Sequence, residues 1–261
     1  MRDAKAKGLG APADLAAGAP RSPTAWRSDA ARIPGTSVHA SLANEIGLRI
    51  VRGDYPPGTI LPNEAKWSET FEISRSAVRE AIKMLMAKSL LASRPKVGSW
   101  VEPRERWNLL DRDVLGWYAM SPDREAFLRT VQEFRHIIEP EATALAAERR
   151  SEEQMAEISA ACREIGEANS LSARTQADTR FHLAILRASG NDLLVPLGVL
   201  IESALSHLFA FTTRELSDLP QAQKLHENIE KNIRLQRPEA ARNSVRKLLA
   251  NTDKIISPSH Q

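Results

Sequence analysis

From residue 105 to the C-terminus, apolar residues recur with the period of a helix, and no segment competes as a strand. The helical segments are separated by SP, RS, GN, DLP and RP breaks, which are typical of helix ends. They lie near 109–119, 123–149, 151–168, 171–189, 191–214, 219–236 and 238–256. The segments are not self-similar, which excludes a repeat solenoid. This part of the chain is predicted to be an all-α bundle of about seven helices with short connections.

The region before the bundle begins with three shorter helices. Apolar residues four apart predict a first helix that ends near Gly53; they are Val38, Leu42, Ile46 and Ile50. Asn63 and Ser74 are plausible N-caps, because their side chains can accept a hydrogen bond from an unpaired backbone N–H. They predict a second helix through about Phe71 and a third from Arg75 to about Ala87.

A small hairpin is predicted after the third helix. Residues 90–94 and 99–102 have the character of two short strands, joined by a tip over residues 95–98 that contains Pro and Gly. Three helices followed by a basic hairpin is the layout of a winged helix-turn-helix. The predicted fold is therefore mainly α, with a winged helix-turn-helix over 36–104 and a bundle over 105–261.

Charge is distributed unevenly along the chain. Residues 36–104 carry ten Lys and Arg against seven Asp and Glu, whereas residues 105–261 carry twenty against twenty-three. This asymmetry points to the first half for any binding of a polyanion. Residues 1–35 are rich in Ala, Gly, Pro and Ser without an apolar period, and are predicted to be a disordered tail.

The single cysteine, Cys162, cannot form an internal disulfide. No apolar run of signal-peptide length follows Met1, and no apolar stretch approaches the roughly 18 residues of a transmembrane span. We therefore expect a cytoplasmic protein without a membrane partner.

The third helix carries a basic face. Arg75, Arg79 and Lys83 are four apart, and an Arg can read guanine in the major groove by a bidentate bond to O6 and N7. Ser74 and nearby N–H groups could bind phosphate, and Lys83 is better placed for a phosphate than a base. Three residues of the hairpin could reach an adjacent groove or the backbone: Arg94, Lys96 and Gly98.

The alternative for this face is a solvated surface that only improves solubility. Glu72 and Glu80 are possible ion-pair partners of Arg79 in that interpretation. The order of capped helices, PPG turn and basic hairpin favours DNA binding over it.

The stretch ANEIGLRIVRGDYPPGTILPNEAKWSETFEISRSAVREAIKMLMAKSLLASRPKVGSWV resembles the winged-helix domain of the GntR family of bacterial transcription regulators. The I..G.Y.PG..LP.E, SR..VREA and R...G..V blocks occur in order at the usual separations. The resemblance implies that Arg75 and Arg79 read bases and that the tip around Val97 and Gly98 meets the minor groove. Many members have Arg where this chain has Ala65, so one DNA contact is missing.

Asp178 and His182 lie four apart in ADTRFHLAIL and therefore share one face of a helix, which is half of a divalent-metal site. His226, on a separate helix, could complete a set of two His and one carboxylate. An i,i+4 hydrogen-bonded pair is the alternative. Because imidazole must be neutral to ligate, the affinity for an effector that binds a metal held by these residues should fall as the pH drops through about 6.

The blocks FRHIIEPEATALAAER, ADTRFHLAILRASGNDLL and LHENIEKNIRLQRPEAARNSV resemble the FCD effector domain of the FadR subfamily. The resemblance implies a metal held by Asp178, His182 and His226, with a fourth ligand at or near Leu248, which cannot coordinate. The metal could be zinc, nickel, manganese or iron. The missing ligand either opens the site to water and an effector carboxylate, which we favour, or abolishes metal binding.

Arg135 begins the R-x-x-x-E-P run that the subfamily uses to line its effector pocket, and a guanidinium can clamp a carboxylate in two parallel bonds. An i,i+4 pair with Glu139 is the alternative. Ser206 and His207 could face the same cavity, or could be satisfied interior groups. WNLLDRDVLGW resembles a segment in regulators of galactonate and related sugar-acid catabolism, and its tryptophans predict packing between the domains.

Together these features predict a homodimeric, DNA-binding repressor of sugar-acid catabolism genes that a small hydroxy-carboxylate releases from its operator. A metal-responsive regulator is one alternative. A metalloenzyme with two His and one carboxylate is another, but nothing in the sequence supplies a general base or a cosubstrate site. We therefore expect no enzymatic activity and no catalytic residues.

Overall fold

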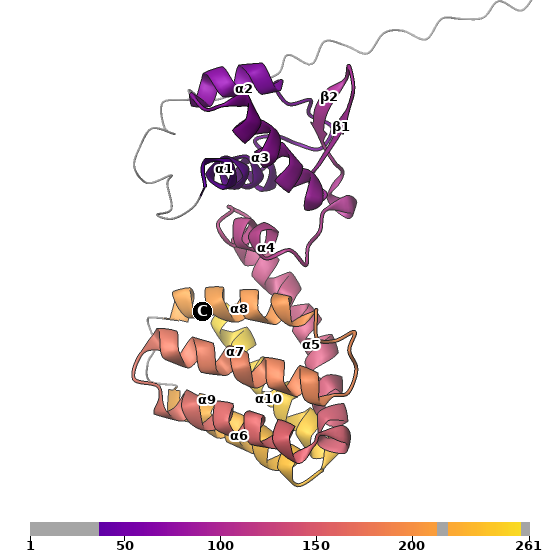
Figure 1. Cartoon of the computed structure of the whole chain (residues 1–261). Coiled ribbons are helices and arrows are strands. Elements are labelled where there is room, and N and C mark those ends of the chain that lie inside the picture. The colour runs from indigo at the N-terminus through magenta and orange to yellow at the C-terminus, as the bar shows by residue number, and fades with distance from the viewer. Residues whose placement is uncertain (1–36, 213–218, 257–261) are drawn as a thin grey trace, which may run out of the picture.

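The computed structural model describes residues 37–212 and 219–256, so the predicted tail over residues 1–35 lies outside the described residues. Figure 1 shows a small N-terminal unit and a larger helical bundle, with one short helix between them. The predicted mainly α fold, with a two-stranded hairpin in the N-terminal unit, is confirmed. Within the described ranges, no helix has both the length and the apolar character needed to cross a bilayer.

Side-chain caps fix the starts of the first three helices. These helices are α1 (Val38–Arg52), α2 (Glu64–Phe71) and α3 (Arg75–Ala87). Ser37, Asn63 and Ser74 each accept a hydrogen bond from a backbone N–H of the first turn, which confirms the two predicted caps. Gly53 ends α1 with a φ of 87°, a backbone conformation that favours glycine.

The apolar series along α1 forms part of the core of the N-terminal unit. Leu42, Ile46 and Ile50 are buried and pack with Val78 and other side chains of α2, α3 and the hairpin. Val38, the first residue of the predicted series, is 43% exposed because it lies in the first turn, beyond the edge of this core.

The hairpin consists of β1 (Leu91–Arg94) and β2 (Gly98–Val101), each within one residue of its predicted position. The strands are antiparallel, with Arg94 opposite Gly98. Lys96 and Gly98 have φ angles of 67° and 96°, so the backbone turns at the tip through the left-handed region.

The extended segment after the PPG turn pairs with strand β2 of this hairpin. Val101 N–H donates to Thr59 O at 3.0 Å, and Leu61 N–H donates to the Ser99 carbonyl at 2.8 Å. Ile60 forms a bridge with Trp100. The sequence pattern did not indicate this pairing, which fixes the start of α2 relative to the hairpin.

A single 3₁₀ turn (η3, Arg104–Arg106) and α4 (Arg112–Ala119) follow the hairpin. Trp107, Val114 and Trp117 belong to the same buried cluster as the apolar residues of α1–α3. The Trp117 ring rests directly on Gly47 of α1, where a Cβ would lie 2.4 Å from the ring. The segment after the hairpin is therefore part of the N-terminal core.

Polar contacts hold α4 to both units. Lys88 Nζ, at the end of α3, lies 2.9 Å from the carboxylate of Asp111 and 2.7 Å from that of Asp113. On the other side, Arg112 forms an ion pair with Glu202 of the bundle. Tyr118, at the end of α4, stacks on Phe127 with ring centroids 5.2 Å apart. α4 thus contacts the winged helix and the bundle together.

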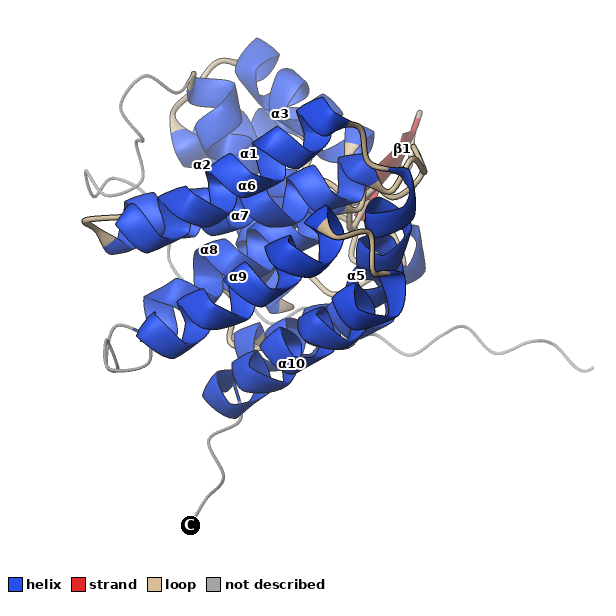
Figure 2. Ribbon diagram, turned by 90° about the horizontal axis from the view of Figure 1, so that it is seen from below, coloured by secondary structure: helices blue, strands red, loops and turns tan. Residues whose placement is uncertain are grey.

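Six further helices form the bundle, seen from below in Figure 2. They are α5 (Arg124–Arg149), α6 (Glu152–Glu167), α7 (Leu171–Ala188), α8 (Gly198–Thr212), α9 (Leu219–Arg234) and α10 (Pro238–Ile256). Phe181 of α7 lies at its apolar core with Ile158, Ile165 and Ile229. With α4, the described residues contain the seven helices predicted after the hairpin.

α8 begins at Gly198 rather than near residue 191. Leu194 N–H donates to the Asn191 carbonyl and Gly198 N–H donates to that of Val195, so the chain forms successive turns instead of a helix. Pro196 has no N–H to continue a helical ladder through this segment.

We predict that Gly47→Ala destabilises the protein by about 1 kcal/mol or more, because the rigid Trp117 ring occupies the space of the new methyl group. Gly116→Ala is the matched control, since a Cβ there meets nothing within 4 Å and should add up to about 1 kcal/mol of helix propensity. Urea unfolding of the two variants measures the difference. Equal stabilisation of both would contradict the packing of α4 on α1.

Candidate functional site

The basic face predicted on α3 is exposed in the structure. Ser74 Oγ accepts from Ala77 N–H at 3.2 Å, so the helix begins at Arg75. Arg75, Arg79 and Lys83 are all exposed on successive turns. The Arg75 guanidinium forms no hydrogen bond or ion pair with the residues that the structure describes, although its charge helps to lower the pKa of the Glu64 carboxyl. The guanidinium is available to a ligand at the N-terminal end of α3.

Arg79 is paired with a residue that the sequence did not indicate. Its Nε donates to Glu64 Oε1 at 3.0 Å and its Nη2 to Glu64 Oε2 at 2.8 Å. The hydrogen bond from Arg79 lowers the pKa of the Glu64 carboxyl. Glu80, one of the two partners expected for Arg79, instead forms a hydrogen-bonded ion pair with Lys83 at 2.9 Å. The packing of α2 across α3 brings Glu64 to Arg79. The two residues are 15 apart in sequence, so helical spacing could not predict the pair.

The hairpin presents the three predicted residues at its exposed tip. Arg94, Lys96 and Gly98 are exposed, and the Arg94 guanidinium lies 5.7 Å from the centre of the Trp100 ring. Val97 between them is 54% exposed. A basic tip with an apolar residue at its end can approach a groove of DNA.

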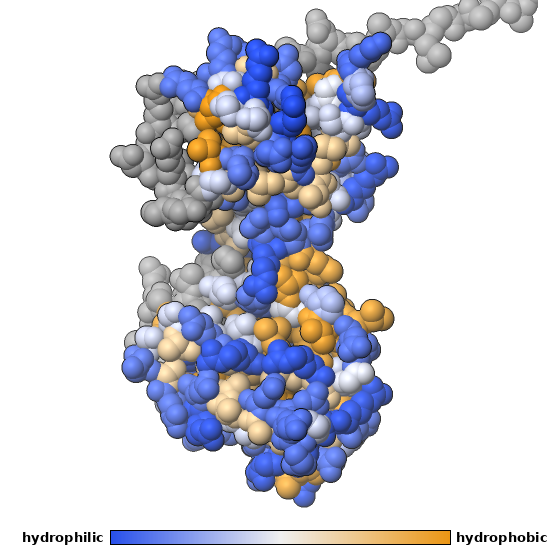
Figure 3. All heavy atoms as spheres, in the orientation of Figure 1, coloured by the Kyte–Doolittle hydropathy of each residue, from blue (hydrophilic) through white to orange (hydrophobic). Residues whose placement is uncertain are grey.

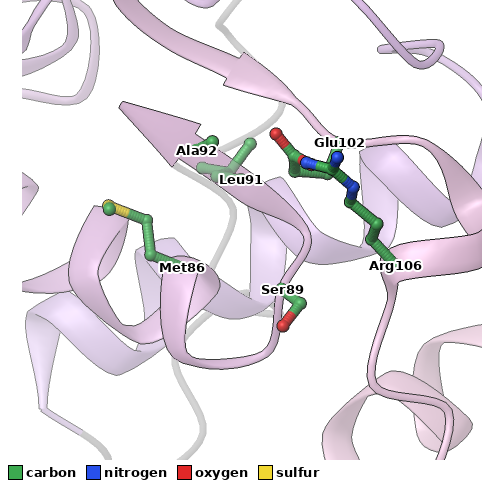
Figure 4. Close-up of a pocket in the computed structure, with 6 residues that line it drawn as sticks. All are labelled: Met86, Ser89, Leu91, Ala92, Glu102 and Arg106. Carbon is green, nitrogen blue, oxygen red and sulfur yellow. The ribbon is translucent and has the colours of Figure 1, made fainter. Parts of the chain in front are cut away.

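A shallow pocket of about 410 Å³ lies between the C-terminal end of α3 and the hairpin, at the end of α3 away from Arg75 (Figure 4). Its lining includes the Glu102 carboxylate. One oxygen of Glu102 accepts from Trp100 Nε1 at 3.0 Å and the other from Arg106 Nη1 at 2.6 Å. Since both oxygens are engaged, we assign this pocket no function.

The three predicted metal ligands come together inside the bundle. Asp178 and His182 of α7 and His226 of α9 are all buried, and one ligand atom from each lies within 4.8 Å of the other two. Asp178 Oδ1 is 3.0 Å from His226 Nε2 and 3.3 Å from His182 Nε2. A single carboxylate oxygen therefore faces a ring nitrogen from each of two histidines.

Contacts on the far side of each ring orient these nitrogens. His226 Nδ1 lies 2.8 Å from the Ala222 carbonyl, which can only accept, so the proton is on Nδ1. His182 Nδ1 faces Glu139 Oε2 of α5 at 2.8 Å. A metal-binding histidine commonly has such a carbonyl or carboxylate on its other nitrogen. Both Nε2 atoms are thereby left to face Asp178.

Opposite charges determine the protonation states in this cluster. Burial alone would raise the pKa of Glu139, but Arg135 and His182 outweigh it and hold that pKa at about 2. Burial would lower the pKa of His182, but Glu139 and Asp178 raise it to about 9. The two histidines also outweigh burial at Asp178 and hold the pKa of its carboxyl well below the usual range. The site therefore favours positive charge between two carboxylates.

The donor set fits a divalent cation. His182 Nε2 is buried and has no partner in hydrogen-bond geometry, although Asp178 lies 3.3 Å away. Each Nε2 lone pair would repel the nearby carboxylate oxygen of Asp178. A proton on each nitrogen, or a metal ion between the three atoms, removes this repulsion. Leu248, near the predicted fourth-ligand position, is buried in the apolar core of the bundle and supplies no donor. Three protein ligands leave coordination positions for other groups.

The predicted effector residues differ in their placement. Arg135 is 1% exposed, and its Nε donates to Glu139 Oε1 at 2.5 Å, which is the i,i+4 pair considered as the alternative. Ser206 is exposed on α8, next to the buried Leu205, and its role as a cavity-lining residue stays a prediction. The side chain of His207 lies outside the described residues.

Glu139 belongs to this cluster, although nothing in the sequence indicated a functional role for it. It was considered only as a partner of Arg135, yet it contacts both Arg135 and His182. The contact with Arg135 could be predicted because Glu139 follows it by four residues in one helix. The contact with His182 depends on how α5 packs against α7.

Two families match separate parts of the chain. Residues 39–101 match the bacterial regulatory proteins of the gntR family, and residues 130–251 match the FCD domain. The first range covers α1–α3 and the hairpin, and the second covers the buried cluster. α4 lies between them.

The similarity to known transcriptional regulators extends over most of the chain. The galactonate operon transcriptional repressor of Escherichia coli (strain K12) is 34% identical over 209 residues, which cover 79% of this chain and 91% of that protein. The uncharacterized HTH-type transcriptional regulator YieP of the same organism is 34% identical over 82% of this chain and 93% of its own length.

Among solved structures, Lar, which controls the expression of the Listeria monocytogenes agr system, has a TM-score of 0.59 and 19% identity. The match covers 86% of this chain and 99% of Lar and concerns the fold alone. The two matched families and the similarity to regulators along nearly their whole length define the class of this protein. The chain belongs to the GntR family of bacterial transcription regulators, in its FCD-containing, FadR-type branch, and is a DNA-binding regulator rather than an enzyme.

Proposed function

We propose that this protein is a homodimeric repressor of sugar-acid catabolism genes, released from its operator by a small hydroxy-carboxylate. The observation that carries the proposal is the similarity to the galactonate operon repressor over 91% of that protein's length. The buried cluster of carboxylates, histidines and Arg135 supports a polar, anionic effector, because it offers both cationic donors and metal ligands.

In this proposal α3 enters the major groove, with Arg75 and Arg79 reading bases. Lys83, one turn later, would contact phosphate, and Ser74 with the first backbone N–H groups would anchor the helix start. The tip residues Arg94, Lys96 and Gly98 would meet the neighbouring groove or backbone. All of these residues are exposed, which supports this docking. The Ser74 hydroxyl also accepts a hydrogen bond from Ala77 N–H.

A homodimer would present two such units to a near-palindromic operator, since one winged helix reads few base pairs. The bundle supports self-association because it exposes apolar side chains, among them Ile137 of α5 and Leu193 and Val195 before α8. Figure 3 shows hydrophobic surface on the bundle just below the winged helix. We assign the dimer contact to the bundle half of the chain.

We predict that Arg75→Ala and Arg79→Ala each cost about 1–3 kcal/mol of binding to a duplex that the wild-type protein selects from a random pool. Each change should also relax the preference at one operator position, whereas Lys83→Ala should weaken all sequences alike. Quantitative gel shifts on selected and scrambled duplexes measure both effects. Arg180→Ala, which removes an exposed arginine of the bundle, is the control. Unchanged affinity of the Arg75, Arg79 double variant would contradict the proposed recognition helix.

For the bundle, we propose that Asp178, His182 and His226 hold one divalent ion, either zinc, nickel, manganese or iron. Such an ion would supply Lewis acidity and open positions for a carboxylate or hydroxyl group of the effector. Arg135 is the proposed second anchor. Its Nη1 makes only a 3.4 Å contact with Gln132 Oε1, so this edge of the guanidinium keeps hydrogen-bonding capacity. Ser206 and His207, predicted from the sequence, are not needed in this arrangement.

We predict that chelation removes the binding of sugar acids, and that His182→Ala removes it in the metal-loaded preparation as well. Calorimetry on the full-length protein with a panel of sugar acids, before and after chelation, is the measurement. His136→Ala, which changes a half-buried histidine of α5 that pairs with Asp253, is the control. Unchanged effector binding after chelation would make the three residues structural, and release of DNA by metal alone would favour the metal-responsive regulator.

We predict that the metal affinity of the stripped protein rises about tenfold per pH unit between pH 7 and 9, because binding must displace at least the proton of His182. The affinity should level off above about 9. The sequence alone suggested a transition near 6; Glu139 and Asp178 move it upward by favouring the imidazolium.

The same shift has a consequence for stability. Folding raises the pKa of His182 from 6.5 to about 9, so its protonation stabilises the metal-free folded state. This stabilisation is complete below about pH 6.5 and is lost as the pH rises through about 9. Metal titrations at several pH values, with melting curves of the stripped protein, measure both trends. A pH-independent metal affinity from 7 to 9 would contradict the assignment of His182 as a ligand.

A further inference from the structure

The ion pair between Glu64 and Arg79 has a defined geometry. Glu64 receives the Nε and Nη2 hydrogen bonds, so it occupies the edge of the guanidinium that runs along the Arg79 side chain. Nη1 donates no hydrogen bond within the described ranges. The edge formed by Nη1 and Nη2 therefore stays open, and it is the edge farthest from the helix backbone.

That open edge carries two parallel N–H groups, one from each Nη nitrogen. Guanine presents two acceptors, O6 and N7, side by side in the major groove, and a guanidinium edge matches them bidentately. An unrestrained Arg side chain has many rotamers and can turn instead to a phosphate, which carries no sequence information. Fixing the plane and the outward edge of Arg79 thus favours contact with a base.

We propose that Glu64 is a positioning residue that sets base specificity by holding Arg79 along one edge and leaving the other edge for guanine. The proposal rests on the proposed role of Arg79 as a base-reading residue. Arg75 has no comparable partner among the described residues, so Arg79 is the better restrained of the two arginines. Glu64 itself need not touch DNA.

The positioning role of Glu64 can be distinguished by experiment from a general electrostatic effect of its negative charge. A carboxylate close to the DNA-facing surface repels phosphates and lowers the affinity for any sequence. A residue kept only to join α2 to α3 would affect stability, and an exposed ion pair contributes little to that. A positioning residue instead lowers non-specific binding while it raises the ratio of specific to non-specific affinity.

The test compares Glu64→Gln with Glu69→Gln in the full-length protein. Glu69 lies on the same helix and pairs with Lys66 at 3.1 Å, so its change removes the same charge without touching Arg79. The probes are a duplex that the wild-type protein selects from a random pool and a scrambled duplex of equal composition, at one salt concentration.

Both variants should bind the scrambled duplex more tightly than the wild type. Only Glu64→Gln should lower the ratio of selected to scrambled affinity, by about fivefold or more, with a weaker guanine preference at one position per half-site. Glu64→Asp, which keeps the charge but shortens the reach, should lower the ratio without tightening binding to the scrambled duplex. In an Arg79→Ala background, Glu64→Gln should cause no further loss of the ratio.

The outcomes separate this inference from the function on which it rests. If Arg79→Ala leaves the ratio unchanged, Arg79 does not read a base and the proposed recognition helix is at fault. If Arg79→Ala lowers the ratio but Glu64→Gln behaves as Glu69→Gln does, the positioning role of Glu64 is overturned. Circular dichroism and melting temperature of each variant establish that the fold is intact.

Discussion

The centre of the bundle depends on the mutual compensation of buried charges. Arg135, Glu139, His182, Asp178 and His226 form a continuous series in which each charged or polar group contacts the next. Removing ions from water is costly, and a buried charge is tolerated only when partners with good geometry surround it. Because the members come from α5, α7 and α9, this requirement fixes the relative positions of three helices. The same requirement makes the site sensitive to any ligand that adds or removes charge.

The two functional regions use charge in opposite ways. In the bundle, carboxylates and imidazoles are buried, so small changes of protonation or ligation act over short distances with little screening. On α3 and the hairpin, the basic side chains are exposed to solvent, and their interactions weaken with salt. α4 lies between the winged helix and the bundle and contacts both, through Trp117 on Gly47 of α1 and through Arg112 with Glu202 of α8. A rearrangement of α1 or of α8 would therefore act directly on α4.

Local sequence patterns predicted most of the elements and the two i,i+4 pairs of the buried cluster, Arg135 with Glu139 and Asp178 with His182. Asn63 and Ser74 could be identified as caps because their hydrogen bonds lie within one turn, and the spacing of Asp178 and His182 placed both on one face of α7. Contacts between helices could not be obtained in this way. His226 meets Asp178 across 48 residues, and Glu139 meets His182 only because α5 and α7 cross at that level. From the residues alone His226 was only a candidate third ligand on a separate helix, and the resemblance to the FCD domain was what implied that it joins Asp178 and His182.

The placement of α4 matters for anyone who wishes to exchange effector domains between regulators of this kind. Trp107, Val114 and Trp117 complete the apolar core of the winged helix, although they follow the hairpin in sequence. A fusion joined directly after the hairpin would leave the groove beside Gly47 open to water and expose apolar side chains of α1. A transplantable DNA-binding module from this chain extends through Ala119, and its new partner must supply a surface for Tyr118 and Arg112.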